Sequence, residues 1–348
     1  MRNFASDNRV RTYQLEHRRE FRPTSVSNLC YENYFYSDDP EVEESLAPLE
    51  GKWAKIIRKI IKHNSIQSLS EWEYYHLLIF LTYTHQRTKT KKLESNEFAT
   101  DIMKLMLEME PIEKGENAET REKALDALES GELRVQHDGV FARQELAGLL
   151  GYVLIADLQP VLLYDRTDRG FIFSDHPVIL ENSRFKKPDT EFVGGFQSQG
   201  LQIICPISSR LAIFLFDGEV YWPTGGGRRV SVGTDDVEEI NKLQVIYALE
   251  GVYYRDSREA EMRVIHNEIE EYRTPIRHDF QELNADEHEF DTENEIVKFG
   301  KPLSDYSAEF QFLENLEVER KLKRSPELSQ LHDEMMDDAL ADVDNKTI

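Results

Sequence analysis

The spacing of apolar residues changes near Pro160, and this change limits the folds open to the chain. Upstream, between Asp39 and Asp157, apolar residues recur at helical spacing. From Pro160 to Trp222, short β-rich runs such as VLLYD, GFIFS and RLAIFLFDG alternate with Gly, Pro, Asn and Asp. We therefore predict the α+β class: a mostly helical N-terminal layer packed with a small antiparallel β-rich region, then a helix and an acidic, partly disordered tail.

Apolar periodicity and capping signals place the helices. They are predicted over 39–61, 68–90, 96–109 and 139–157, with a short charged helix at 118–131. The first contains Pro48, which should bend or divide it. The second should begin at a capping box formed by Ser68 and Glu71. A later helix, TDDVEEINKLQVIYALEG, has Thr234 as its expected N-cap and Gly251 just beyond its end.

These elements predict one domain and a tail. The domain should span residues 1–273, helical over 39–157, β-rich over 160–232 and helical again over 234–272. Residues 274–348 are predicted to be an acidic linker and tail, partly helical, because QELNADEHEFDTENE is too polar to build a core. Within this tail we expect a helix between Ser304 and Lys323, and high mobility beyond about Ala285.

The charge balance bears on partners. The chain carries 66 acidic and 42 basic residues, a formal net charge of -24, and such a surface repels a polyanion. Nucleic acid is therefore disfavoured as a partner. A basic protein is the partner that the acidic tail would attract. An excess of acidic residues is also typical of proteins from a salty cytoplasm, and the sequence does not decide whether the host is of that kind.

Location is predicted from the apolar runs and the cysteines. No apolar run reaches the roughly 18 residues that a membrane span needs, and MRNFASDNRVRTYQ lacks the apolar region of a signal peptide. The cysteines, Cys30 and Cys205, do not make a disulfide framework. We predict a location in the reducing cytoplasm and no membrane partner.

The stretch FIFSDHPVIL, Phe171–Leu180, holds the main candidate site. Asp175 stands two residues before a proline and suits an Asx-turn that joins two strands. It could also face a cleft at a sheet end, where Asp175 and His176 would act as catalytic groups or bind a metal. We favour the structural interpretation and, of the two side chains, Asp175 for any chemistry.

Further polar residues complete the candidate set. Arg87, in HQRTKT, has a fork geometry that suits a carboxylate or phosphate, but near a helix C-terminus it also suits capping or an ion pair. His137 with Asp138 precedes a helix and forms either a turn or a ligand pair. Arg228 and Arg229 follow three glycines in TGGGRRV, a hairpin loop that would also accept an anion.

Several familiar motifs are missing from the sequence. It contains no Gly-x-Ser-x-Gly elbow, no CxxC pair and no dinucleotide fingerprint. The easily recognised hydrolases, zinc ribbons and Rossmann folds are therefore excluded.

The order of five motifs resembles one family. The motifs are VEESLAPLE, HQRTKT, FIFSDHPVI, PISSRLAIFL and EEINKLQVIYA, the last of which contains Asn241 and Gln244. Together they run from Met1 to about Arg255 and resemble the domain-of-unknown-function family numbered 4238. The resemblance implies a cytoplasmic, mostly helical domain with a β-rich insert, and it implies no activity.

The sequence departs from the family pattern at three places. His176 stands where the family has Asn, which argues against an essential imidazole, and Ser209 stands where the family has a second Pro. The family's opening HYVPxFYLRNF is matched only from Arg2 onward, with Met1 where a Leu is expected. We expect either a site that lacks one of its groups or a start codon placed too late, and a groove beside Met1 to Tyr13.

Two functions of different classes follow from these residues. The first is metal-assisted hydrolysis of a phosphoester at a site built from Asp175 and Arg87 with His137 and Asn241, with magnesium or manganese as the cofactor. The second is a non-enzymatic protein-interaction module in which Asp175, Arg87 and Asn241 are structural. Convergence on an open pocket would favour the first function, and a closed buried network would favour the second.

Overall fold

The structure is a computed structural model of the whole chain. It describes residues 2–5, 7–26, 40–109, 116–133, 146–186, 195–273, 281–284, 296–299, 304–321 and 323–344. His137, and with it the expected start of a helix at 139, lies outside these residues.

The described residues combine helices with mixed sheets, so the predicted α+β class is confirmed. The helices are α1 (Pro40–His63), α2 (Glu71–Gln86), α3 (Lys89–Met109), α4 (Glu116–Glu129), α6 (Thr234–Tyr247), α7 (Glu259–Ile269) and α8 (Pro326–Asp344). Residues 146–150 are also helical and continue into a 3-10 turn, Gly151–Ile155. Pro48 lies inside α1.

A five-stranded sheet forms the centre of the molecule. Its strands are β3 (Gln159–Asp165), β5 (Ile179–Glu181), β6 (Gln202–Ser208), β7 (Leu211–Phe216) and β9 (Arg229–Val232), in the order β5-β6-β7-β3-β9. All six residues of β7 are buried, because both faces of the sheet are covered. The pairs are antiparallel except for β3 and β9, which run parallel. The expectation of a purely antiparallel region is wrong at this edge.

A second sheet joins the N-terminal segment to the candidate site. Its strands are β1 (Arg9–Gln14), β2 (Arg19–Ser25), β4 (Phe173–Ser174) and β10 (Gly251–Tyr254), in the order β2-β1-β10-β4. Strand β10 therefore lies between the start of the chain and the turn that carries Asp175. The smaller pairs are β8 (Tyr221–Pro223) with β13 (Leu313–Asn315), and β11 (Gln281–Asn284) with β12 (Ile296–Phe299).

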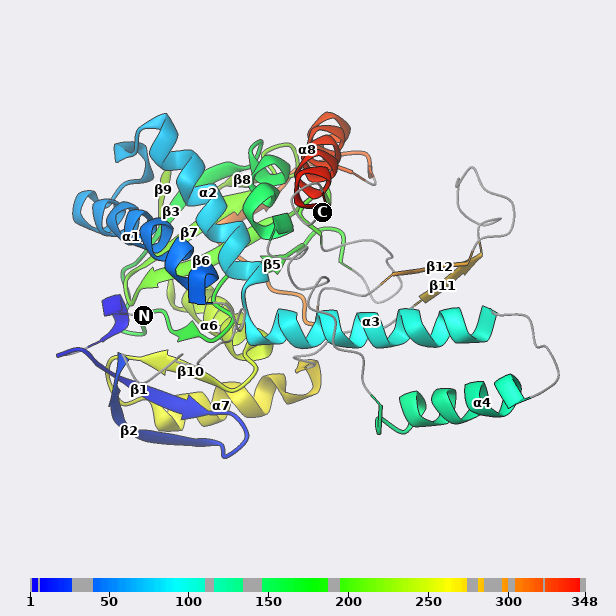
Figure 1. Ribbon diagram of the computed structural model, residues 1–348. Helices are drawn as coiled ribbons and strands as arrows, with labels where there is room; N and C mark the ends of the chain where they lie inside the picture. The colour runs from blue at the N-terminus through cyan, green and yellow to red at the C-terminus, as the bar shows by residue number, and fades with distance from the viewer. Residues whose placement is uncertain are drawn as a thin grey trace.

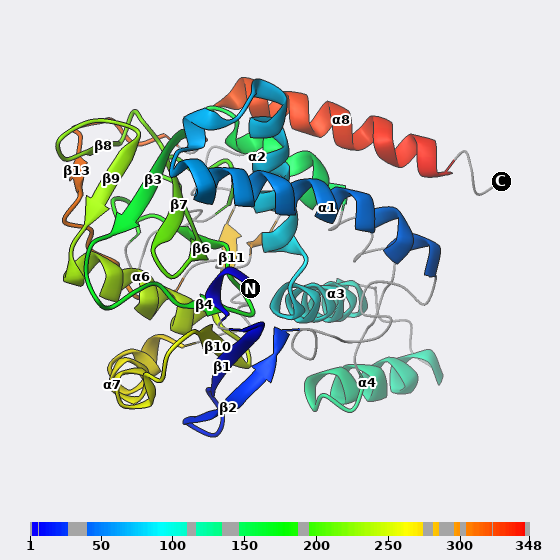
Figure 2. The ribbon, with the colours of Figure 1, turned by 90° about the vertical axis from the view of Figure 1, so that its left-hand side faces the viewer.

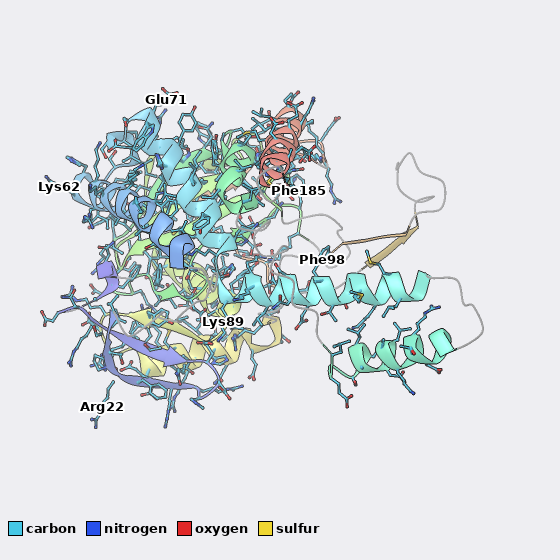
Figure 3. All side chains as sticks on the ribbon, in the orientation of Figure 1. Arg22, Lys62, Glu71, Lys89, Phe98 and Phe185 are labelled. Atoms are coloured by element: carbon cyan, nitrogen blue, oxygen red, sulfur yellow. The ribbon has the colours of Figure 1, made fainter. Side chains whose placement is uncertain are left out.

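Helices cover the central sheet from two sides. Helices α1 and α2 lie on one side, and α6 and α7 lie on the other (Figures 1 and 2). Helix α3 starts at Lys89, next to this body, and extends away from it past Phe98, with α4 packed beside it (Figure 3). Among the described residues, no helix combines the length and the apolar character that crossing a bilayer requires.

Two predicted helix starts are corrected by the structure. Helix α2 is capped by Ser70 and Glu73, not by Ser68 and Glu71, because Ile66–Ser68 forms a 3-10 turn. The Ser70 hydroxyl accepts from Glu73 N, and the Glu73 carboxylate accepts from Ser70 N at 2.8 Å. Helix α6 likewise begins one residue earlier than predicted.

The N-cap of α6 is Gly233, whose N–H donates to the Asp236 carboxylate. The predicted cap, Thr234, is the first residue of the helix. Gly251 does not end the helix, because the helix stops at Tyr247 and Gly251 opens β10. There a side chain would press on the Tyr13 carbonyl at 3.0 Å.

The described C-terminal residues pack against the body. Ala308, Phe310 and Phe312 are buried in the core, and the residues between them are exposed. This two-residue period is that of an extended segment, so the expected helix between Ser304 and Lys323 is wrong. The helix that does form is α8. High mobility was expected here, whereas residues 304–321 and 323–344 contact the domain.

Arg324 joins the start of α8 to the domain. Its buried guanidinium donates to both Asp157 carboxylate oxygens, at 2.7 and 3.0 Å. It also donates to the carbonyls of Leu154, Phe196 and Ser198. A buried arginine with this many acceptors fixes the segment that carries it.

Candidate functional site

The Asp175 carboxylate binds the loop that follows α6. Its Oδ1 accepts from Leu249 N at 2.9 Å, and its Oδ2 accepts from Glu250 N at 2.6 Å and from Gly251 N at 3.0 Å. Burial raises the pKa of Asp175, and the three backbone hydrogen bonds oppose that shift. Both oxygens therefore already have partners within the protein, and those partners are about 75 residues away in the sequence.

Two amides on α6 bind the backbone of the same turn. Asn241 Oδ1 accepts from Ile172 N, and Asn241 Nδ2 donates to Gly170 O, both at 3.0 Å. One turn along the helix, Gln244 accepts from Ser174 Oγ at 2.7 Å and donates to Pro177 O at 3.0 Å. Both amides are fully buried. The i, i+3 spacing of Asn and Gln therefore matches the two ends of the turn.

His176 connects the turn to the corner between α2 and α3. Its Nδ1 lies 2.8 Å from Thr88 Oγ1, and Thr88 in turn accepts from Lys91 N as the cap of α3. The His176 ring is buried and packs edge-on against His85 at 4.9 Å. The ring therefore binds within the protein and does not face open solvent.

His85 is a buried histidine that the sequence did not single out. It donates Nδ1–H to Val178 O at 2.9 Å. Burial lowers the pKa of His85 to about 3, nearby Lys91 adds to that shift, and the bond to Val178 opposes it. This ring is therefore neutral at physiological pH and links α2 to the strand after the turn.

Arg87 ends α2 and forms an ion pair. Its guanidinium donates to Glu50 Oε1 on α1 at 2.7 Å and lies 5.4 Å from the centre of the Tyr83 ring. The Glu50 side chain is 56% exposed and that of Arg87 is 14% exposed. Of the two roles left open by the sequence, the structure shows the ion pair.

A pocket of about 740 Å³ lies beside the turn, and we call it the α1–α2 pocket. Residues from α1, the end of α2, the turn, β6 and the N-terminal segment line it. Asp175 and Arg87 both belong to this lining, whereas His176 and Asn241 do not. Three aromatic rings, Trp53, Phe80 and Tyr83, form part of its wall.

Of the two predicted metal ligands, the structure describes only Asp175. No group of three His, Cys, Asp or Glu side chains suited to a metal occurs there. Since Asp175 already accepts three backbone N–H groups, it offers a metal little free lone-pair capacity. His137, the proposed second ligand, lies outside the described residues.

Arg228 and Arg229 lie apart from the α1–α2 pocket. They stand at β9, on the parallel edge of the central sheet, and neither lines the pocket. The Arg229 guanidinium is 4.6 Å from the centre of the Tyr164 ring. Gly225, Gly226 and Gly227 all have positive φ, which explains the glycine run as a loop.

The sequence missed several residues at the site. Trp53 and Arg58 of α1 line the pocket. The helical spacing of Trp53 indicated only a buried face, and nothing in the sequence marked Arg58. Arg273 was also missed: it donates to Val245 O and Ala248 O at 3.2 and 3.0 Å and so binds the last carbonyls of α6. A cation beyond a helix C-terminus was the available signal.

Comparisons with known proteins bear on the family. No curated protein and no solved structure matches the chain. The family model described as "Protein of unknown function (DUF4238)" matches residues 1–258, which confirms the resemblance carried by the SDHP turn and the Asn-Gln helix. The chain belongs to this family of proteins of unknown function.

Proposed function

We propose that the chain is a non-enzymatic binding module in which Asp175, Arg87 and Asn241 hold the fold. The observation that carries this proposal is the Asp175 carboxylate, whose two oxygens accept three backbone N–H groups. Asn241 likewise binds Ile172 N and Gly170 O at its two ends. A group that must bind substrate or metal needs free capacity, and these groups have partners instead.

The partner that the charge supports is a basic protein. Helix α8 carries an exposed acidic face, which consists of Glu327, Asp333, Glu334, Asp337 and Asp338. Arg324 fixes the start of this helix against the domain, so the face is presented from an anchored element. An acidic surface of this kind steers basic partners by long-range attraction.

A reducing compartment is the proposed location. Cys205 is buried, and burial raises the pKa of its thiol to about 12, which supports a thiol that neither reacts nor pairs. A cytoplasmic location is therefore part of the proposal.

Metal-assisted phosphoester hydrolysis is a second candidate, and one observation favours it. Asp175 and Arg87, the proposed metal ligand and phosphate clamp, line the same pocket. A magnesium or manganese ion would have to displace the N–H groups of residues 249–251 from Asp175. This requirement makes hydrolysis the weaker of the two candidates.

Calorimetric titration with MnCl₂ separates the two functions. We expect no binding heat in the parent protein and a lower unfolding free energy in Asp175→Asn. Manganese binding that disappears in Asp175→Asn, together with manganese-dependent turnover of p-nitrophenyl phosphate, would overturn the binding-module proposal. Asp168→Asn, a fully exposed carboxylate on a neighbouring loop, is the matched control.

A second titration tests the acidic face of α8. An octalysine peptide should bind the parent protein and lose affinity in a variant with Glu334→Gln, Asp337→Asn and Asp338→Asn. The matched control neutralises three exposed acids outside α8, Glu16, Glu71 and Glu129. Equal loss in both variants would show that net charge alone attracts the peptide, and would contradict a specific role for α8.

A further inference from the structure

We infer that the α1–α2 pocket binds an aromatic organic acid, whose carboxylate takes the place of Glu50 on Arg87. This inference goes beyond the proposed function, since it concerns a small-molecule site and not the partner of α8. It also holds whether or not the chain catalyses a reaction.

The size and walls of the pocket indicate an apolar, aromatic ligand. Its volume of about 740 Å³ lies within the range of small-molecule sites, roughly 300–1,000 Å³. Trp53 packs against Tyr83 at 5.5 Å and Phe80 at 6.0 Å between ring centroids, and Phe4 packs against Phe173 at 5.2 Å. All five rings line the pocket. Such walls favour flat rings, which stack at little entropic cost.

An unsatisfied donor in this wall indicates a ligand with an acceptor. Trp53 is 4% exposed, and its Nε1 has no hydrogen-bond partner among the described residues. A buried N–H without an acceptor costs free energy, and binding of a ligand that supplies an acceptor recovers that free energy. Because the nitrogen itself is buried, a ligand acceptor in the pocket reaches it when the Trp53 ring turns toward the ligand.

Two guanidinium groups of the lining select an anion. Arg87 is held over the Tyr83 ring at 5.4 Å, which sets the direction of its fork. Arg58 is exposed on α1 and makes no ion pair with the described residues. The lining also holds the carboxylates of Glu50 and Asp175. Asp175 is already bound by three backbone N–H groups, so the two arginines offer a local site for a negative group once Glu50 is displaced.

Glu50 stands where the ligand carboxylate would bind. Its Oε1 lies 2.7 Å from Arg87 Nη1, while its side chain is 56% exposed. An ion pair with one solvated partner is weak, so a ligand carboxylate can replace that of Glu50 at little cost, while Arg87 keeps its place over the Tyr83 ring at the end of α2. Glu50 therefore competes with the ligand, and its removal should strengthen binding.

The test uses two probes with the same ring system and different charge. Calorimetric titration of the full chain with 2-naphthoate and with the neutral 2-naphthamide isolates the carboxylate. We expect the acid to bind about tenfold more tightly than the amide, as a charge-assisted hydrogen bond predicts. Glu50→Gln should tighten naphthoate binding by roughly two- to fivefold, the scale of an exposed ion pair, and leave the amide unchanged.

Two arginine variants complete the experiment. Arg58→Gln should weaken naphthoate and not naphthamide, and Arg22→Gln, an exposed arginine that does not line the pocket, should change neither. In a Trp72→Phe, Trp222→Phe background, Trp53 is the remaining tryptophan, and its emission should change when naphthoate binds. Equal affinity for acid and amide, no tightening in Glu50→Gln, or unchanged Trp53 emission would each overturn the inference. None of these outcomes depends on metal binding or on the stability of Asp175 variants, so the two proposals fail separately.

Discussion

Asp175 and Gly251 hydrogen-bond to each other in both directions. Gly251 N donates to Asp175 Oδ2 at 3.0 Å, and Asp175 N donates to Gly251 O at 3.3 Å. The turn that carries Asp175 and the first residue of β10 are thereby held together by a side chain and by the backbone. A close backbone approach also explains why position 251 is a glycine.

Loss of the Asp175 carboxylate should destabilise the protein. Asp175→Ala leaves three backbone N–H groups without their acceptor, and we expect a loss of roughly 1–3 kcal/mol in the free energy of unfolding. Asp175→Asn should lose nearly as much, because one amide oxygen cannot serve both Leu249 and the Glu250–Gly251 pair. Urea denaturation measures both values. Asp168→Ala, at an exposed carboxylate, should unfold like the parent, and equal stability of all four proteins would contradict the structural role of Asp175.

Removal of the Asn241 amide should also destabilise the protein. Asn241 is fully buried and bridges Ile172 N and Gly170 O. Asn241→Ala leaves Ile172 N without an acceptor, at roughly 1–3 kcal/mol, while Gly170 O keeps its bond from Arg258. Asn241→Asp keeps the acceptor and removes the donor to Gly170, so it should also destabilise. Thermal unfolding would report this, with Asp235→Asn on the exposed side of α6 as the control. An unchanged melting temperature in Asn241→Ala would exclude a structural role.

His85 should make stability depend on pH. Burial lowers the pKa of His85 from 6.5 to about 3. As the pH falls, the imidazole is therefore protonated near pH 6.5 in the unfolded chain and only near pH 3 in the folded protein. The contribution of a neutral His85 is thus complete above 6.5 and is lost as the pH falls toward 3, by about 1.4 kcal/mol per pH unit. The His85→Asn variant isolates this contribution to stability, because Asn does not titrate and can still donate to Val178 O.

The difference in unfolding free energy between the parent and His85→Asn should therefore be constant above pH 7 and should fall steadily between pH 6 and pH 4. The same substitution at His63, which is exposed at the end of α1, is the matched control. A flat difference for His85→Asn would show that the ring is not buried as described.

Arg324 should hold the C-terminal segment on the domain. Its partners are the Asp157 carboxylate and three backbone carbonyls, and truncation of a buried, paired arginine costs about 3–5 kcal/mol. Limited trypsin digestion of Arg324→Met should release α8 earlier than digestion of the parent. Lys323→Met, at the exposed neighbouring residue, also removes one tryptic site and is the matched control. Early loss of α8 from the parent would instead support the mobile tail predicted from the sequence.

Much of the fold was encoded in local sequence. Apolar patterns predicted α1, α2 and α6 and the strands β3, β5, β6 and β7 of the central sheet, because each element must present its apolar side to one core. The motifs around Asp175 and Asn241 were sufficient for the family. The segment of Ala308, Phe310 and Phe312 alternates apolar and polar residues with a period of two, which is the pattern of a strand, but we predicted a helix there.

Tertiary structure alone decided what the polar residues do. Asp175 finds its donors at residues 249–251, Asn241 finds its partners at 170 and 172, and Arg87 finds Glu50 on another helix. The α1–α2 pocket gathers residues from α1, α2, the turn and β6. Periodicity and capping depend on neighbours within a few residues, whereas a hydrogen bond or a pocket depends on which distant segments meet when the apolar faces pack. The sequence therefore identified Asp175, Asn241 and Arg87 as candidate residues, and only the tertiary structure showed which groups they bind.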